Sequence, residues 1–233
     1  AVLLAFIILR ARDRLLAEIR DRSGALARAL AEARAAQGEA MAARNEAVAA
    51  RNEALAAAAI NGSQMAPIRA LAAMKSVGVH VASDALALGN LAGPHAQGGA
   101  VIIMGDDPWC DSTQVPADSR FICEHLRMPV LEPGTPQQLK DWIDVSFKIS
   151  QASRLYVGYV VTNYIVDGGG SVQCRPNQFP QISTNERMML DTASIPVNET
   201  VLLPPRTWQR ELTFPDRLKK AAQVARELGV NRI

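Results

Sequence analysis

The segment that most constrains the fold is a short apolar run, Ala100–Met104, with turn residues on both sides. Gly98-Gly99 precedes this run, and Gly105-Asp-Asp-Pro108 follows it. A continuous apolar run of this length between turn residues is typical of a fully buried parallel strand. Such a strand delivers the polar loop that follows it to the carboxyl edge of a sheet. Open α/β sheets bind their ligands at that edge.

Predicted strands and helices alternate over most of the chain. Apolar runs predict further strands at 68–74, 128–131 and 155–161, and helices are expected at 82–91, 118–127, 136–153 and 216–228. Thr135 is expected to cap the helix that begins at Pro136, and Gly229 to end the last helix. This alternation predicts an α/β fold with a mostly parallel sheet flanked by helices.

The first sixty residues have a different composition. Residues 11–60 contain no proline, and alanine, the residue with the highest helix propensity, fills about half of positions 25–59. We predict one long helix or two helices here, with Ser23-Gly24 as the most favourable break. A heptad spacing recurs at Met41, Val48 and Leu55. This run is too brief to establish a coiled coil.

Residues 1–9 are wholly apolar, and arginines follow at positions 10, 12 and 14. Nine residues are too few to cross a bilayer, which takes about 20. The chain begins with Ala1 rather than Met, so we expect further sequence upstream. The segment is then either the end of a membrane helix with basic residues on its cytoplasmic side, or a buried strand or helix end. A signal peptide would carry its positive charge before the apolar run.

Composition limits the classes of function. A net charge of +2 gives no electrostatic case for binding nucleic acid, and 48% hydrophobic residues indicate a folded core. Three widely spaced cysteines predict reduced thiols in the cytoplasm rather than a disulfide framework. We expect three parts: a long helical segment at 1–50 that could approach a membrane, an α/β domain at 51–166, and a loop-rich extension with a C-terminal helix at 167–233.

Several short motifs follow one another in a recognisable order. They are Asn52-Glu53, Gly62-Ser-Gln64, Gly89-Asn-Leu-Ala-Gly93, His95, Gly98-Gly99, Gly105-Asp-Asp107, Ser112-Thr113, Ser119, Met128-Pro-Val-Leu131, Leu202-Leu-Pro204 and Leu228–Ile233. In this order and spacing they resemble the 2-oxoacid:ferredoxin oxidoreductases, and within these the indolepyruvate ferredoxin oxidoreductases. The resemblance covers about three quarters of the chain.

The resemblance implies the pyrimidine-binding domain of a thiamine diphosphate enzyme. Such enzymes decarboxylate an aryl 2-oxoacid such as indolepyruvate, pass electrons through iron–sulfur clusters to ferredoxin, and form an aryl-acetyl-CoA. Family members hold magnesium with Gly-Asp-Gly and Asn-Asn motifs in a diphosphate-binding domain, and neither motif occurs here. The resemblance therefore implies that magnesium, the clusters and CoA bind to domains absent from this chain. We expect a fragment that partners the diphosphate domain and is inactive alone.

Three residues are candidates for the cofactor site. Glu53 precedes Gly62 by nine residues, the family's spacing for the catalytic glutamate that faces the aminopyrimidine ring. A carboxyl group at the ring nitrogen favours the imino tautomer, which then removes the thiazolium proton. The alternative is that Glu53 is one more solvated charge on an Ala-rich helix. Gly78 is expected to bring backbone close to the pyrimidine, and His95 to reach substrate or cofactor. Each is otherwise an ordinary loop residue.

The two aspartates after the central run do not predict a metal site. Pro108 follows Gly105-Asp-Asp, where the family's metal motif requires Gly-Asp-Gly. We expect Asp106 to tie its loop with side-chain-to-backbone hydrogen bonds. Ser112 and Thr113 have no His–Asp arrangement that would activate a nucleophile.

A second class of function stays open from the sequence. In it, the chain is a non-catalytic interaction module, and the N-terminal helix attaches a degenerate α/β domain to a membrane or to a partner helix.

Overall fold

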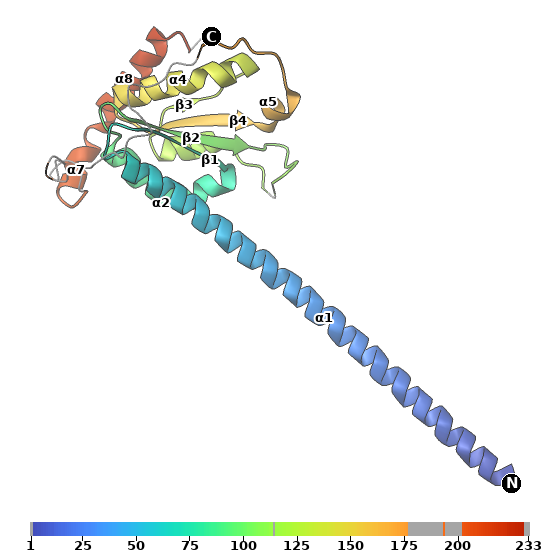
Figure 1. Cartoon of the computed structure of the whole chain (residues 1–233). Helices are drawn as coiled ribbons and strands as arrows, with labels where there is room; N and C mark the ends of the chain where they lie inside the picture. The colour runs from blue at the N-terminus through green and yellow to red at the C-terminus, as the bar shows by residue number, and fades with distance from the viewer. Residues whose placement is uncertain (1, 114, 177–192, 194–201, 231–233) are drawn as a thin grey trace. The chain divides into compact units, whose positions relative to one another are not determined.

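The computed structural model describes residues 2–113, 115–176, 193 and 202–230 (Figure 1). The chain divides into two compact units, residues 1–49 and residues 50–233. The first unit is helix alone, and the second is the α/β domain. The three-part division expected from the sequence stays a prediction.

Helix α1 (Val2–Ser63) runs through the predicted break at Ser23-Gly24, so the two-helix alternative is wrong. The Ser23 hydroxyl donates to the Arg20 carbonyl at 2.8 Å, inside the helix, instead of capping a new one. A single glycine costs a helix about 1 kcal/mol, which the alanines on both sides offset. Among the described residues, no helix is long and apolar enough to cross a membrane.

The sheet of the second unit has four strands, all parallel, in the order β1-β2-β4-β3. The strands are β1 (Arg69–Lys75), β2 (Gly99–Asp106), β3 (Val130–Leu131) and β4 (Val157–Thr162). The apolar run Ala100–Met104 lies in β2, between β1 and β4, as the sequence predicts. The predicted fold class, a parallel sheet flanked by helices after a long N-terminal helix, is confirmed.

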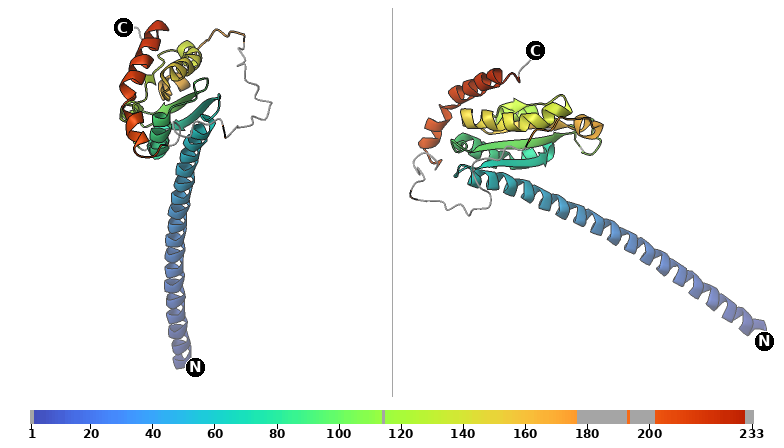
Figure 2. Two further views of the ribbon diagram at one scale, coloured as in Figure 1. Left: turned by 90° about the vertical axis from the view of Figure 1, so that its left-hand side faces the viewer. Right: turned by 45° about the horizontal axis from the view of Figure 1, so that its top comes forward.

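Helices cover both faces of the sheet (Figures 1 and 2). The end of α1 lies on one face with α2 (Ser76–Ala92) and α3 (Ser119–His125), and α4 (Pro136–Ser153) lies on the other with α8 (Phe214–Glu227). Successive residues of β2 enter different cores, since Ile102 packs with the first group and Val101 with the second. Two short helices, α5 (Asn163–Gly168) and α7 (Arg206–Glu211), were not predicted.

Several element boundaries differ from the sequence prediction. Helix α2 begins at Ser76, six residues before the predicted start, because the helix follows β1 without a loop. The third strand is only two residues long. The predicted caps are confirmed: the Thr135 side chain accepts a hydrogen bond from the Gln138 amide, and Gly229 has a φ of 66° beyond the end of α8. Local capping residues therefore marked helix ends better than the apolar pattern did.

A buried polar network holds the amino edge of the sheet together. The Asn90 side chain, fully buried in α2, donates to the Leu126 carbonyl at 2.7 Å and accepts from the Tyr156 amide at 2.8 Å. The Tyr156 hydroxyl donates to Asn61 at 2.9 Å, and Asn61 donates to the Ala85 carbonyl at 2.7 Å. Since each bond joins different elements, the network fixes α1, α2, α3 and β4 to one another.

Two arginines from the end of the chain close the last turn of α2. Arg217 in α8 donates to the Leu91 and Asn90 carbonyls at 3.1 and 2.7 Å, and Arg210 in α7 donates to Leu91 and Ala92 at 3.1 and 2.6 Å. Cationic donors suit a helix C-terminus, where the last carbonyls have no partner within the helix. Burial, together with the charges of the neighbouring Arg210 and Arg154, lowers the pKa of Arg217 to about 9.

Candidate functional site

Glu53 and Gly78, predicted from the sequence as cofactor-site residues, lie in contact. Glu53 is half-buried near the end of α1, and Gly78 is buried in the first turn of α2. A Cβ atom at Gly78 would come within 2.6 Å of the Glu53 Cγ and 2.8 Å of its Oε1. The Glu53 side chain therefore packs directly against the Cα of Gly78, near the carboxyl end of β1. Only glycine leaves room for this path.

The Glu53 carboxylate accepts no hydrogen bond and joins no ion pair among the described residues. A second polar group without a partner lies two residues before Gly78. The Ser76 hydroxyl, on a residue only 1% exposed, has no hydrogen-bond partner among them either. Lys75 precedes α2 and makes no capping hydrogen bond to it through its side chain. Buried polar groups normally have partners, so this cluster could bind a polar ligand.

The two aspartates after β2 hold loops in place. Asp106, as expected, binds backbone: its carboxylate accepts from the Ser119 amide at 2.8 Å and from the Ser119 hydroxyl. Asp107 accepts from the amides of Asp111, Ser112 and Thr113 at 3.0, 2.6 and 2.9 Å. These bonds, that from Ser112 first, hold the pKa of Asp107 below its usual value. Both carboxylates are thus engaged by the protein itself.

The loop tied by Asp107 borders the Glu53–Gly78 pair. The Lys75 ammonium group, at the end of β1, donates to the Ser112 carbonyl at 3.2 Å. Asn163, directly after β4, donates to Asp107 and Asp111 at 3.2 and 2.8 Å. Beside this loop, a cavity of about 610 Å³ opens at the carboxyl ends of β2, β3 and β4. Its walls include Trp109, which is 80% exposed. The carboxyl edge therefore carries both the unpartnered polar groups and an open cavity.

His95 lies at the opposite edge of the sheet. It follows α2 and precedes β2, so it occupies the amino edge, whereas Glu53 and Gly78 lie where β1 ends. Its Nδ1 accepts a hydrogen bond from the Gln97 amide at 3.1 Å. Burial lowers the pKa of His95, and the charge of Arg154 lowers it further. The structure does not bring His95 to the other two candidates. A role for it in the same cofactor site stays a prediction that this placement does not support.

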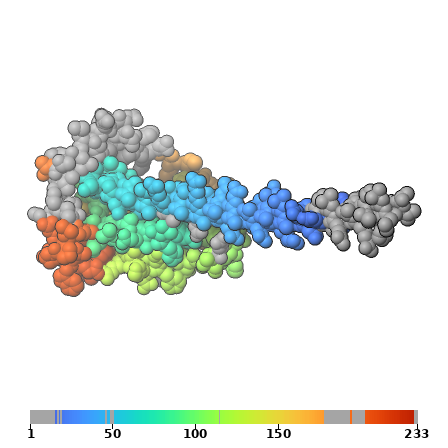
Figure 3. Space-filling view, turned by 90° about the horizontal axis from the view of Figure 1, so that it is seen from below, coloured from blue at the N-terminus to red at the C-terminus, as the bar shows by residue number. Residues whose placement is uncertain are grey.

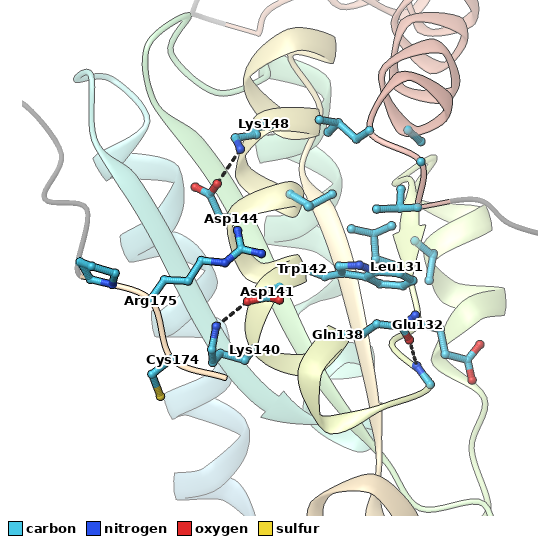
Figure 4. Close-up of a pocket in the computed structure, with 18 residues that line it drawn as sticks. Leu131, Glu132, Gln138, Lys140, Asp141, Trp142, Asp144, Lys148, Cys174 and Arg175 are labelled. Carbon is cyan, nitrogen blue, oxygen red and sulfur yellow. Dashed lines mark hydrogen bonds and ion pairs between the residues drawn. The ribbon is translucent and has the colours of Figure 1, made fainter. Parts of the chain in front are cut away.

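A larger cavity, of about 1190 Å³, lies over α4 and the short strand β3 (Figure 4). Ion pairs engage charged side chains of its wall: Lys140 with Asp141, and Lys148 with Asp144 at 2.8 Å. It lies away from the end of β1, and none of the three predicted site residues lines it. We therefore place the candidate site at the carboxyl edge, where unpartnered polar groups gather.

Sequence reasoning missed Ser76, to which it gave no role. Its burial and lack of a partner depend on the way α2 begins directly after β1. The position of His95 could have been predicted from the sequence, because a residue between a helix and the next parallel strand must lie at the amino edge of the sheet.

The chain is similar to a group of curated oxidoreductase subunits. All of those compared carry the name indolepyruvate oxidoreductase subunit IorA. The protein from Methanothermobacter marburgensis is 30% identical over 177 residues, which are 76% of this chain and 26% of that protein. The protein from Archaeoglobus fulgidus is 39% identical over 90 residues, or 39% of this chain and 14% of that protein. The Pyrococcus abyssi protein is 40% identical over 86 residues, or 37% and 13%.

These matches confirm the resemblance drawn from the sequence: the chain is related to an oxidoreductase subunit that acts in a multi-subunit enzyme. That relative is the indolepyruvate oxidoreductase subunit IorA. The chain spans between 13% and 26% of the length of these three relatives. No family model matches the chain, and neither does any solved structure.

Proposed function

We propose that this chain supplies the pyrimidine-binding part of a thiamine-diphosphate-dependent indolepyruvate ferredoxin oxidoreductase. The observation that carries the proposal is the contact between Glu53 and Gly78 at the carboxyl end of β1. Two residues singled out separately in the sequence meet at the edge where an open α/β sheet binds ligands. The similarity to the named oxidoreductase subunit supports the same assignment.

The residues at this edge fit a polar aromatic cofactor. Within the described part of the chain, Glu53 offers a carboxyl group without a partner, and Ser76 offers a buried hydroxyl without one. When bound, thiamine diphosphate supplies the electron sink that the decarboxylation of an aryl 2-oxoacid requires. Glu53 would exchange a proton with a ring nitrogen of that cofactor, and Gly78 would keep the glutamate side chain in place. Magnesium, the iron–sulfur clusters and CoA would bind to the rest of the enzyme, and ferredoxin would accept the electrons.

Reconstitution tests the proposal directly. The chain is combined with a partner that carries the diphosphate-binding domain and cluster cysteines of such an enzyme, and indolepyruvate-dependent ferredoxin reduction is measured. We expect no turnover from either part alone and activity from the pair. Because Glu53 would hold the transferred proton, Glu53→Gln should lower the rate by about 10² to 10⁴-fold.

The chain offers a matched control for this substitution. Glu46 stands in the same Arg-Asn-Glu context seven residues earlier on α1, so Glu46→Gln makes the same chemical change at a position that lacks the nine-residue spacing to Gly62. It should leave the rate unchanged. A reconstituted enzyme that keeps full activity with Glu53→Gln would contradict the assignment.

A second function, as an interaction module, is favoured by one observation. Between residues 20 and 45 of α1, every residue except Gly24 is exposed, and these residues include large aliphatic ones. Such a helix offers a surface to a partner, whether or not the α/β domain takes part in catalysis.

A further inference from the structure

The cavity of about 610 Å³ at the carboxyl edge is separate from the candidate cofactor site, because none of Glu53, Ser76 and Gly78 lines it. Its described walls come from the loop after β2, the start of α4 and the segment after β4, within residues 109–111, 134–136 and 163–169. Cavities of about 300 to 1,000 Å³ bind small molecules. Figure 3 shows α5 and the residues after it at the surface, in brown.

Two aromatic side chains of this wall are exposed, Trp109 by 80% and Tyr164 by 83%. The indole N–H and the phenol hydroxyl make no hydrogen bond among the described residues. Elsewhere, arginines lie over the rings of Phe147 and Phe214, between 4.9 and 5.4 Å from the ring centres. Within the described part of the chain, no cation lies over the ring of Trp109 or Tyr164. Both rings are therefore available to a ligand.

The charged side chains of the wall are carboxylates. Asp111 and Asp167 line the cavity, and no described lysine, arginine or histidine does. Asp167 has no hydrogen bond or ion pair among the described residues, and the Asp111 carboxylate accepts only from the neutral Asn163 amide, at 2.8 Å. Lys75, beside the loop, donates to the Ser112 carbonyl and is not in the wall. Two carboxylates without a cation repel an anion, so the cavity disfavours a 2-oxoacid.

Rings and carboxylates together select one class of ligand. The face of an aromatic ring is negative and attracts a cation, and a carboxylate attracts the same charge. We propose that this cavity binds an organic cation, an ammonium or guanidinium group. Trp109 and Tyr164 contact the group, and Asp167 is its counter-ion. The inference concerns a second ligand and does not depend on the proposed function.

A pair of probes with the same shape tests the proposal. Choline and 3,3-dimethylbutanol differ in charge, since a carbon atom replaces the quaternary nitrogen. Each is titrated into the isotope-labelled full chain, and NMR follows the indole N–H of Trp109, which Trp109→Phe identifies among the signals of the three tryptophans. We expect a saturable shift, with choline binding about 10-fold more tightly than the alcohol. Equal affinities, or no shift at Trp109, would overturn the proposal.

Two substitutions separate the charge from the ring. Asp167→Asn removes the charge and keeps the shape, and Trp109→Leu removes the ring. Each should weaken choline binding by about 3- to 10-fold, followed at the amide signal of Gly169 in the cavity wall. Matched controls are Asp84→Asn on α2 and Trp208→Leu on α7, which change exposed residues outside the cavity and should have no effect. Undiminished affinity in both wall variants would overturn the proposal.

The cationic group could belong to a free amine or to a lysine or arginine of a partner protein. For a partner side chain, Asp167→Asn should weaken assembly with the partner that carries the diphosphate domain by about 10-fold relative to Asp84→Asn. For a free amine, both variants should assemble normally and the complex should still bind choline. A complex that excludes choline, while Asp167→Asn assembles normally, would overturn the proposal. The choline titrations use this chain alone, so their failure is distinguishable from failure of the reconstitution.

Discussion

The polar side chains at the two edges of the sheet differ in their hydrogen bonding. At the amino edge, the side chains of Asn61, Asn90 and Tyr156 each have partners on other elements. At the carboxyl edge, Glu53 and Ser76 have none among the described residues. A satisfied network stabilises the fold, whereas a buried group without a partner, such as the Ser76 hydroxyl, costs stability. The contrast separates the scaffold from the candidate site, and substitutions at the two edges should have different effects.

After Glu53→Gln, the largest effect on the site is expected from Gly78→Ala. The added Cβ would meet the Glu53 Cγ at 2.6 Å, and the flexible glutamate side chain would move aside. Because a displaced catalytic group loses most of its effect, the reconstituted rate should fall by about 100-fold. Stability should change by no more than about 1 kcal/mol, since alanine favours the helix. A large loss of stability on urea unfolding, with the rate unchanged, would make Gly78 a scaffold residue.

The reverse result is expected at the amino edge. Asn90→Ala removes a fully buried amide and leaves the Tyr156 amide and the Leu126 carbonyl without partners. Unsatisfied buried groups should lower the free energy of unfolding by about 3 kcal/mol, measured by urea denaturation. Below the onset of unfolding, the reconstituted enzyme should keep its rate. A rate that falls while stability holds would show that the two edges are coupled through α2.

The smallest effect is a dependence of stability on pH. The folded-state pKa of Asp107 lies below its usual value of 3.8 because of hydrogen bonds led by that from the Ser112 amide. The stabilisation from Asp107 is therefore fully present above about pH 4 and is lost as the pH falls through the lower folded-state pKa. The urea midpoint should decrease over this range, and Asp107→Asn should flatten the decrease. An identical slope in the variant would assign the acid sensitivity to other carboxylates.

Most of the fold could be predicted because its signals are local. The apolar run of β2, the cap at Thr135 and the glycine after α8 each depend on a few neighbouring residues. Glu53 and Gly78 were found through the resemblance, and the structure added their contact. The burial of Asn90 gave no comparable signal, because it depends on contacts with elements far away in the chain. The unpartnered state of Ser76 is likewise visible only in three dimensions.

The arginine contacts at the end of α2 have a consequence for biosynthesis. This helix starts at Ser76, yet its last carbonyls bind Arg210 and Arg217, which lie more than a hundred positions later in the chain. While the protein is being translated, those carbonyls have only water as a partner until α7 and α8 have left the ribosome. Final tightening of the last turn of α2 therefore waits for α7 and α8, and premature termination before α7 would release a nascent domain in which this turn is loosened.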